Sequence, residues 1–160
     1  MKDVKREDIK LFHGGRYTKK FMENGEVRTR LVVSDGTRMS HTEMCDYDIS
    51  AGDLPWQDAH LHQGLIEQYT LIEGWAYFIS EYDAAVTSHC TRIGETIKFA
   101  PGVPHVVLLG PNAKITTVLF GTPVPNPERK GEDWWPADNM FVEAAALQQS
   151  RCKEEVLRSV

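Results

Sequence analysis

Short stretches of alternating or β-branched residues run along most of the chain. Turn-favouring residues, such as Gly52-Asp53-Leu54-Pro55 and Gly110-Pro111-Asn112, separate them. The stretches are TRLVV, RMSHTEMCDYDIS, LIEQYTLI, WAYFIS, AVTSHC, ETIKF, HVVLL and KITTVLF. Many short strands at a spacing of about 8 to 12 residues predict a sandwich or barrel, and no long helical pattern lies between them. The pattern therefore indicates an all-β fold.

The chain changes character after residue 120. Residues 121–137, GTPVPNPERKGEDWWPA, carry four prolines and paired tryptophans, which predicts an ordered but irregular arm. Beyond it, Asp138 or Asn139 is suited to cap a helix over about 139–157, with a distal half polar enough to fray. The apolar stripe expected on its first half consists of Phe141, Ala144, Ala145 and Leu147.

Length and charge limit the number of domains and the kinds of partner that the chain could have. The 160 residues predict a single domain, 1–160, with a core barrel at about 30–120 that is large enough to fold without a structural metal or disulfides. The formal charge of −5, with basic residues dispersed, argues against nucleic acid as a partner. No stretch approaches the ~20 apolar residues of a membrane helix. The charged N-terminus is unlike a signal peptide, so we expect no membrane association and a cytoplasmic location.

The three cysteines, Cys45, Cys90 and Cys152, include no C-x-x-C pair, and their odd number cannot close a complete disulfide framework. Reduced thiols in a reducing compartment are the simplest interpretation. Cys45 and Cys90 fall in strand-like runs, which predicts small core residues.

Four residues carry the candidate chemistry: His60, His62, Glu67 and His105. His60 and His62 are separated by one residue and share a face if the segment is extended. Glu67 lies an odd number of positions further on, so a regular strand would turn it away. We expect Gly64 to mark a bulge that restores the shared face.

Three imidazoles and one carboxylate are suited to a divalent transition metal, namely Fe, Mn, Zn, Ni, Co or Cu, and leave coordination positions open. With neutral histidines the metal retains about one positive charge by formal counting. It would then attract and polarise an anionic or enolisable oxygen ligand. A single histidine usually only packs, but this combination seldom arises by accident.

These residues also resemble two sequence motifs of the cupin superfamily. His60, His62, Glu67 and Gly74 match the first motif, a His-x-His pair followed by Glu and Gly at fixed spacing. The segment GETIKFAPGVPH is similar to the second, with Gly94, Gly102 and His105 in register. The four residues between His62 and Glu67 are similar to the spacing in germins and quercetinases, whereas acireductone dioxygenases have three.

The resemblance implies a double-stranded β-helix, a cupin jelly-roll barrel, followed by a C-terminal α-helix. It implies that His60, His62, Glu67 and His105 hold the metal inside the barrel. Many cupins are dimers, so a homodimer is expected, with the N-terminal segment and the helix available to a partner subunit.

Two further residues are candidates for catalysis. If His41 faces the cavity, it could act as a general base or orient a substrate; the alternative is a solvent-facing histidine. Gln68 and Tyr69 flank Glu67 on opposite faces, so at most one of them is expected to face the metal. Trp56 is a candidate wall of the pocket, and an ordinary core or loop aromatic is the alternative, favoured at least equally. Trp134 and Trp135 either cover the barrel mouth or pack the arm against its outside, and packing is favoured.

Two classes of function follow. The first is a metal-dependent enzyme acting on a small oxygenated molecule, a sugar, keto acid or enediol, as an isomerase, dioxygenase or lyase. The second is a non-catalytic module that binds or senses a small ligand. A structural barrel with an incidental metal is the least favoured alternative. The residues name neither the metal nor the substrate.

Overall fold

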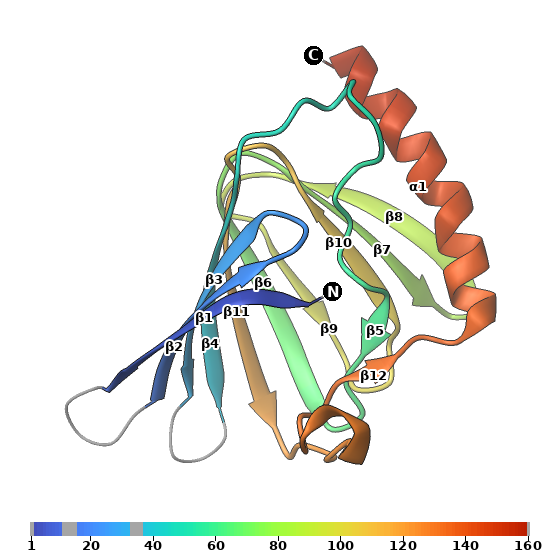
Figure 1. Ribbon diagram of the computed structural model, residues 1–160. Coiled ribbons are helices and arrows are strands. Elements are labelled where there is room, and N and C mark those ends of the chain that lie inside the picture. The colour runs from blue at the N-terminus through green and yellow to red at the C-terminus, as the bar shows by residue number, and fades with distance from the viewer. Residues whose placement is uncertain (1, 11–15, 33–36, 160) are drawn as a thin grey trace.

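The computed structural model describes residues 2–10, 16–32 and 37–159, which form two antiparallel sheets and a C-terminal helix (Figure 1). The larger sheet has the strand order β1-β2-β3-β4-β11-β6-β9 and the smaller one β12-β5-β10-β7-β8. The larger sheet consists of β1 (Asp3–Lys10), β2 (Arg16–Met22), β3 (Glu26–Val32), β4 (Arg38–Met44), β11 (Lys114–Gly121), β6 (Leu65–Glu73) and β9 (Thr96–Phe99). The smaller sheet consists of β12 (Trp135–Pro136), β5 (His60–Leu61), β10 (His105–Leu109), β7 (Ala76–Tyr82) and β8 (Ala85–Thr91). The helical elements are η1 (Pro127–Arg129) and α1 (Asn139–Ser159).

The two sheets pack face to face and enclose the main core. Side chains from both sheets contribute to it, because alternate residues of each strand point inward. Its buried members are Met44, Tyr69, Leu71, Ala76, Phe78, Phe99, Val107, Leu109, Ala113 and Ile115. This arrangement confirms the predicted all-β jelly-roll barrel.

Strand β10 is buried on both faces, which explains its unbroken apolar run after His105. Val107 and Leu109 point into the barrel with the histidine, whereas Val106 and Leu108 belong to a second core beneath α1. His105 lies opposite Ser80 of β7 and opposite His60 of β5. The strand thus fixes one candidate ligand between two neighbours.

Helix α1 lies across the outer face of the smaller sheet (Figure 1). Asp138 caps it, because its Oδ1 accepts a hydrogen bond from the Phe141 backbone N–H at 2.8 Å. The helix runs from Asn139 to Ser159, close to the predicted range. The predicted helix and its cap are therefore confirmed.

The apolar stripe of α1 differs from the predicted one. Phe141 and Ala145 are buried as expected, but Leu147 is 69% exposed. Cys152 and Val156 continue the buried face into the distal half, which packs on the sheet. Leu147 lies six residues after Phe141, about 240° around the helix, so a residue facing the sheet at position 141 directs 147 to solvent.

The structure corrects the expectation for two cysteines and decides between the alternatives for Trp56. Cys45 and Cys90 are exposed, because each lies on the outward face of its segment, and Cys152 is the buried cysteine. Trp56 does not line the cavity; it packs edge-to-face on Tyr77 beneath the helix, with ring centroids 6.2 Å apart. In the described part of the chain, no helix is long and apolar enough to span a membrane.

Candidate metal centre

Four buried side chains, the four predicted ligands, converge on one point of the barrel interior. One ligand atom each from His60, His62, Glu67 and His105 lies within 4.8 Å of the other three. The Nε2 atoms of His105, His62 and His60 lie 2.9, 3.0 and 3.6 Å from Glu67 Oε2. The fold thus brings together residues from β5, from the turn that follows β5, and from β6 and β10, across both sheets.

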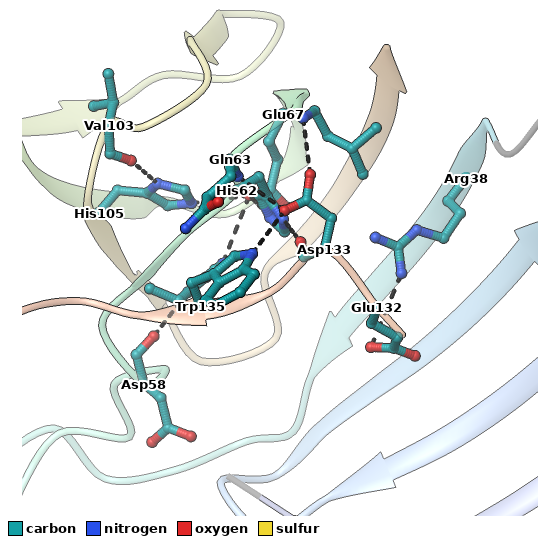
Figure 2. A network of polar contacts seen from close by, with 12 residues as sticks. Arg38, Asp58, His62, Gln63, Glu67, Val103, His105, Glu132, Asp133 and Trp135 are labelled. Carbon is teal, nitrogen blue, oxygen red and sulfur yellow. Dashed lines mark hydrogen bonds and ion pairs between the residues drawn. The ribbon is translucent and has the colours of Figure 1, made fainter. Parts of the chain in front are cut away.

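Backbone carbonyls fix the tautomer of each histidine. The Nδ1 atoms of His60 and His105 lie 2.8 and 3.0 Å from the carbonyl oxygens of Asp58 and Val103. The Nδ1 atom of His62 faces the carbonyl oxygen of Asp133 (Figure 2). A carbonyl only accepts hydrogen bonds, so Nδ1 carries the proton in each ring. Each Nε2 lone pair is thereby directed toward Glu67, as metal-binding histidines require.

The donor set fits a divalent metal. Three Nε2 lone pairs and a carboxylate oxygen are all acceptors, and acceptors this close together repel unless protons or a cation lie between them. Histidine nitrogen and carboxylate oxygen suit the first-row transition ions. The site can therefore hold such an ion, although the ligand set does not select one metal.

The charges of these side chains agree with this assignment. Burial opposes ionisation of Glu67, but the adjacent imidazoles of His105 and His60 hold its pKa well below the usual value. Burial and the neighbouring His105 lower the pKa of His60 to about 4. Burial also opposes a charge on His62, yet its bond with Glu67 raises its pKa above the usual value. Glu67 is anionic and His60 neutral at pH 7, and any proton taken up at His62 Nε2 would compete with a metal for that lone pair.

Aromatic stacking holds two of the ligand rings in place. Phe99 is nearly parallel to His105, with an interplanar angle of 3° and centroids 4.1 Å apart. Trp134 stacks on His60 at 5.5 Å and 15°. These contacts restrict ring rotation and shield the rings from water.

Gly64 lies where the chain passes from one sheet to the other. Strand β5 of the smaller sheet ends at Leu61, and β6 of the larger sheet begins at Leu65. The predicted bulge within one strand is therefore wrong, because the parity change arises at this corner. A Cβ on Gly64 would lie 1.9 Å from the Thr122 carbonyl oxygen, so close backbone packing requires glycine here.

Asp133, which the sequence reasoning missed, holds this corner in place. Its Oδ1 accepts the Gln63 backbone N–H at 2.8 Å, and its Oδ2 accepts those of Gly64 and Leu65 at 2.9 and 3.0 Å. Burial opposes its charge, but backbone donors, Gln63 first, lower the pKa of Asp133 below its usual value. The Asp133 carboxylate thus holds residues 63–65, and its carbonyl oxygen faces His62 Nδ1 (Figure 2). Asp133 therefore connects the arm to the segment that carries His62. Nothing in the sequence links two positions that are about 70 residues apart.

A cavity of about 450 Å³ lies beside the four ligands. Glu67, His60 and His62 line it, together with inward-facing residues of β3 and β4 and with the arm. Those from β3 and β4 are Arg28, Arg30, Arg38, Ser40 and Thr42. This volume is within the range of sites for small molecules.

The structure separates the two catalytic candidates. Tyr69 is 4% exposed, lines the cavity and lies on the same face of β6 as Glu67, whereas Gln68 faces away. Burial and the Glu67 carboxylate raise the pKa of Tyr69 well above its usual value. The condition attached to His41 is not met. It points to the opposite face of β4 from the cavity, 3.2 Å from Glu43, because residues 40 and 42 occupy the inward positions.

The paired tryptophans of the arm have different surroundings. Trp134 lines the cavity, between the His60 ring and the Arg129 guanidinium, which lies 4.0 Å from its centroid. Packing against the outside of the barrel, which the sequence favoured, is therefore wrong for Trp134. Trp135 belongs to β12 at the edge of the smaller sheet and donates its indole N–H to Asp133 at 3.1 Å.

Comparisons with known proteins identify the fold. No protein-family model and no curated protein matches the sequence. Among solved structures, KdgF from Halomonas sp. has a TM-score of 0.52 at 10% identity, over 65% of this chain and 87% of that one. Oxalate decarboxylase from Bacillus subtilis has a TM-score of 0.52 at 15% identity, over 76% of this chain and 30% of that one. A recombinant oxalate oxidase in complex with glycolate has 0.50 at 18%, over 66% and 55%.

These neighbours are cupin-fold proteins, and this chain has the cupin fold. At such low identity the likeness shows the fold alone. The candidate metal centre rests on the convergence of its own four side chains.

Proposed function

We propose that this protein is a metal-dependent enzyme that acts on a small oxygenated molecule. The observation that supports it is the convergence of three Nε2 lone pairs and one carboxylate oxygen beside a cavity of about 450 Å³. A metal that only stabilised the fold would have no need of an adjacent cavity lined with polar side chains. Sugars, keto acids and enediols, which offer oxygen donors, are the substrate classes.

His60, His62, Glu67 and His105 would hold the metal, which when bound supplies a Lewis acid that polarises a substrate oxygen. Trp134, Phe99 and the barrel core exclude water from one side of the centre. Water exclusion strengthens every electrostatic interaction with the substrate.

Tyr69 is the residue of this chain best placed to move a proton. With a strongly raised pKa it keeps its hydroxyl proton at neutral pH, so it is a hydrogen-bond or proton donor in its resting state, not a base. It would donate to substrate oxygen in the cavity next to Glu67. His41, outside the cavity, is not part of this proposal.

Turnover distinguishes the enzyme from the alternative, a module that only binds a ligand. The Fe(II) and Mn(II) forms would be screened aerobically and anaerobically against sugars, keto acids and diols. Oxygen-dependent turnover would identify a dioxygenase, and oxygen-independent turnover an isomerase or lyase. Saturable binding without turnover across the panel would contradict the enzyme proposal. In an active form, Tyr69→Phe should lower kcat while metal content stays unchanged.

A further inference from the structure

Two arginines, Arg30 and Arg38, line the cavity beside the candidate metal centre. They lie on the neighbouring strands β3 and β4, with inward-facing side chains that are only 17% and 12% exposed. Glu132 is the carboxylate within 4 Å of both in the described part of the chain. Its Oε1 is 3.7 Å from Arg30 Nη1. Its Oε2 is 3.9 Å from Arg38 Nη1 (Figure 2). Both distances exceed those of a hydrogen bond, and the Glu132 side chain is 48% exposed.

Arg28 lies two residues before Arg30 on the same face of β3, and its guanidinium is engaged in hydrogen bonds. Its Nε and Nη2 donate to Glu26 Oε2 at 2.7 and 2.6 Å. By contrast, Arg30 Nε is buried and has no acceptor among the described residues. Native proteins seldom leave a buried N–H without a partner, and such a group calls for an explanation.

The two arginines also leave an excess of positive charge. Burial and the neighbouring Arg38 lower the pKa of Arg30 to about 10, so Arg30 remains charged at neutral pH. The two guanidinium groups share one loosely held carboxylate. Across the cavity, a divalent ion with three neutral histidines and Glu67 would retain one positive charge by formal counting. The cavity would then be positive at both ends.

We propose that the cavity binds a small organic acid whose carboxylate is held by Arg30 and Arg38, with oxygen donors at its other end directed toward His60, His62, Glu67 and His105. This deepens the proposed function and rests on it. Glu132 already places a carboxylate against the two guanidinium groups, which shows that a carboxylate fits there. As a half-exposed side chain at ion-pair distance, Glu132 is displaced by the carboxylate of the ligand, which supplies the acceptor that Arg30 Nε lacks.

Pairs of 2-oxo acids test this inference by direct binding. 2-Oxoglutarate and 2-oxoadipate end in a carboxylate, whereas 2-oxopentanoate and 2-oxohexanoate have the same lengths and end in a methyl group. Calorimetry would measure the Kd of each probe for the Mn(II)-loaded protein after its metal content has been determined. We expect at least one carboxylate-ended probe to bind about 10- to 100-fold more tightly than its methyl-ended partner, since hydrogen bonds to charged groups have energies of that order.

Three variants assign this preference to the arginine pair. Arg30→Gln and Arg38→Gln should each reduce the preference toward unity while metal content and thermal stability are retained. Glu132→Gln should strengthen binding of the carboxylate-ended probe, because it removes the competing carboxylate; a merely structural role would not produce that gain. Arg92→Gln, a substitution of an exposed arginine outside the cavity, is the matched control and should change nothing.

The outcomes separate this inference from the proposed function. A protein that takes up no metal at the four ligands overturns both. A metal-loaded protein that binds the paired probes equally, or binds none of them, overturns the inference and leaves the metal site standing. Retention of the preference in both arginine variants also overturns it.

Discussion

Replacing Asp133 with asparagine tests how the arm supports the metal centre. The carboxylate is buried, and each oxygen accepts two hydrogen bonds: Oδ1 from Gln63 N–H and the Trp135 indole, Oδ2 from Gly64 and Leu65 N–H. Asparagine keeps one acceptor oxygen and turns an NH₂ group toward the other two donors. Whichever way the amide is oriented, two charge-assisted hydrogen bonds are lost.

The expected cost follows from that count. At roughly 1.5–3 kcal/mol for each hydrogen bond to a charged group, Asp133→Asn should lower the free energy of unfolding by about 3 kcal/mol or more. The same change loosens the corner that carries His62, whose Nδ1 faces the Asp133 carbonyl oxygen. Loss of such a supporting contact typically weakens metal affinity by roughly 10- to 100-fold.

Urea unfolding followed by circular dichroism would measure stability, and competition with a chelator would measure metal affinity. Asp138→Asn is the matched control, because asparagine caps a helix about as well as aspartate and both values should stay near the wild type. An Asp133→Asn protein with wild-type stability and metal affinity would refute the assigned role of Asp133.

Three further predictions concern the same region. Gly64→Ala should lower the free energy of unfolding by roughly 1–3 kcal/mol and weaken metal binding, because the new Cβ collides with the Thr122 carbonyl oxygen. A variant as stable as the wild type in the same unfolding assay would contradict that contact. His41→Ala should change the free energy of unfolding by less than about 0.5 kcal/mol and leave any turnover intact, since His41 lies outside the cavity. A large loss of turnover would restore His41 as a catalytic candidate. Metal affinity should rise as pH increases through the raised pKa of His62 and level off above it, because a proton on His62 competes with the metal. Calorimetry in buffers of different ionisation enthalpy should detect the released proton, and a pH-independent affinity would argue against this competition.

The sequence revealed those features that depend on local pattern. Alternation predicted most strands of the barrel but not β1 and β2, which lie in the charged N-terminal segment, and Asp138 marked the start of the helix. The four candidate ligands were recognisable because their spacing matches two cupin motifs. Each of these signals lies within a few residues of the position it describes.

Features that depend on contacts between distant segments were not predicted. Asp133 reaches Gln63 and Leu65 across about 70 residues, and no local pattern reports that contact. The corner at Gly64 was interpreted as a bulge because a sequence does not show that the chain changes sheets. His41 remained ambiguous for a related reason: strand alternation gives two faces, and only the assembled sheets decide which one is inside.

The central claim is that His60, His62, Glu67 and His105 hold a divalent metal, and metal analysis of the purified protein tests it most directly. The chain would be stripped with a chelator, reloaded separately with Fe(II), Mn(II), Zn(II), Ni(II), Co(II) and Cu(II), and desalted before elemental analysis. His89→Ala, a substitution of an exposed histidine outside the cluster, is the matched control. We predict near-stoichiometric metal in the wild type and in His89→Ala, and its loss in the variant that combines His60→Ala with His105→Ala. Near-stoichiometric metal persisting in that double variant would contradict the account.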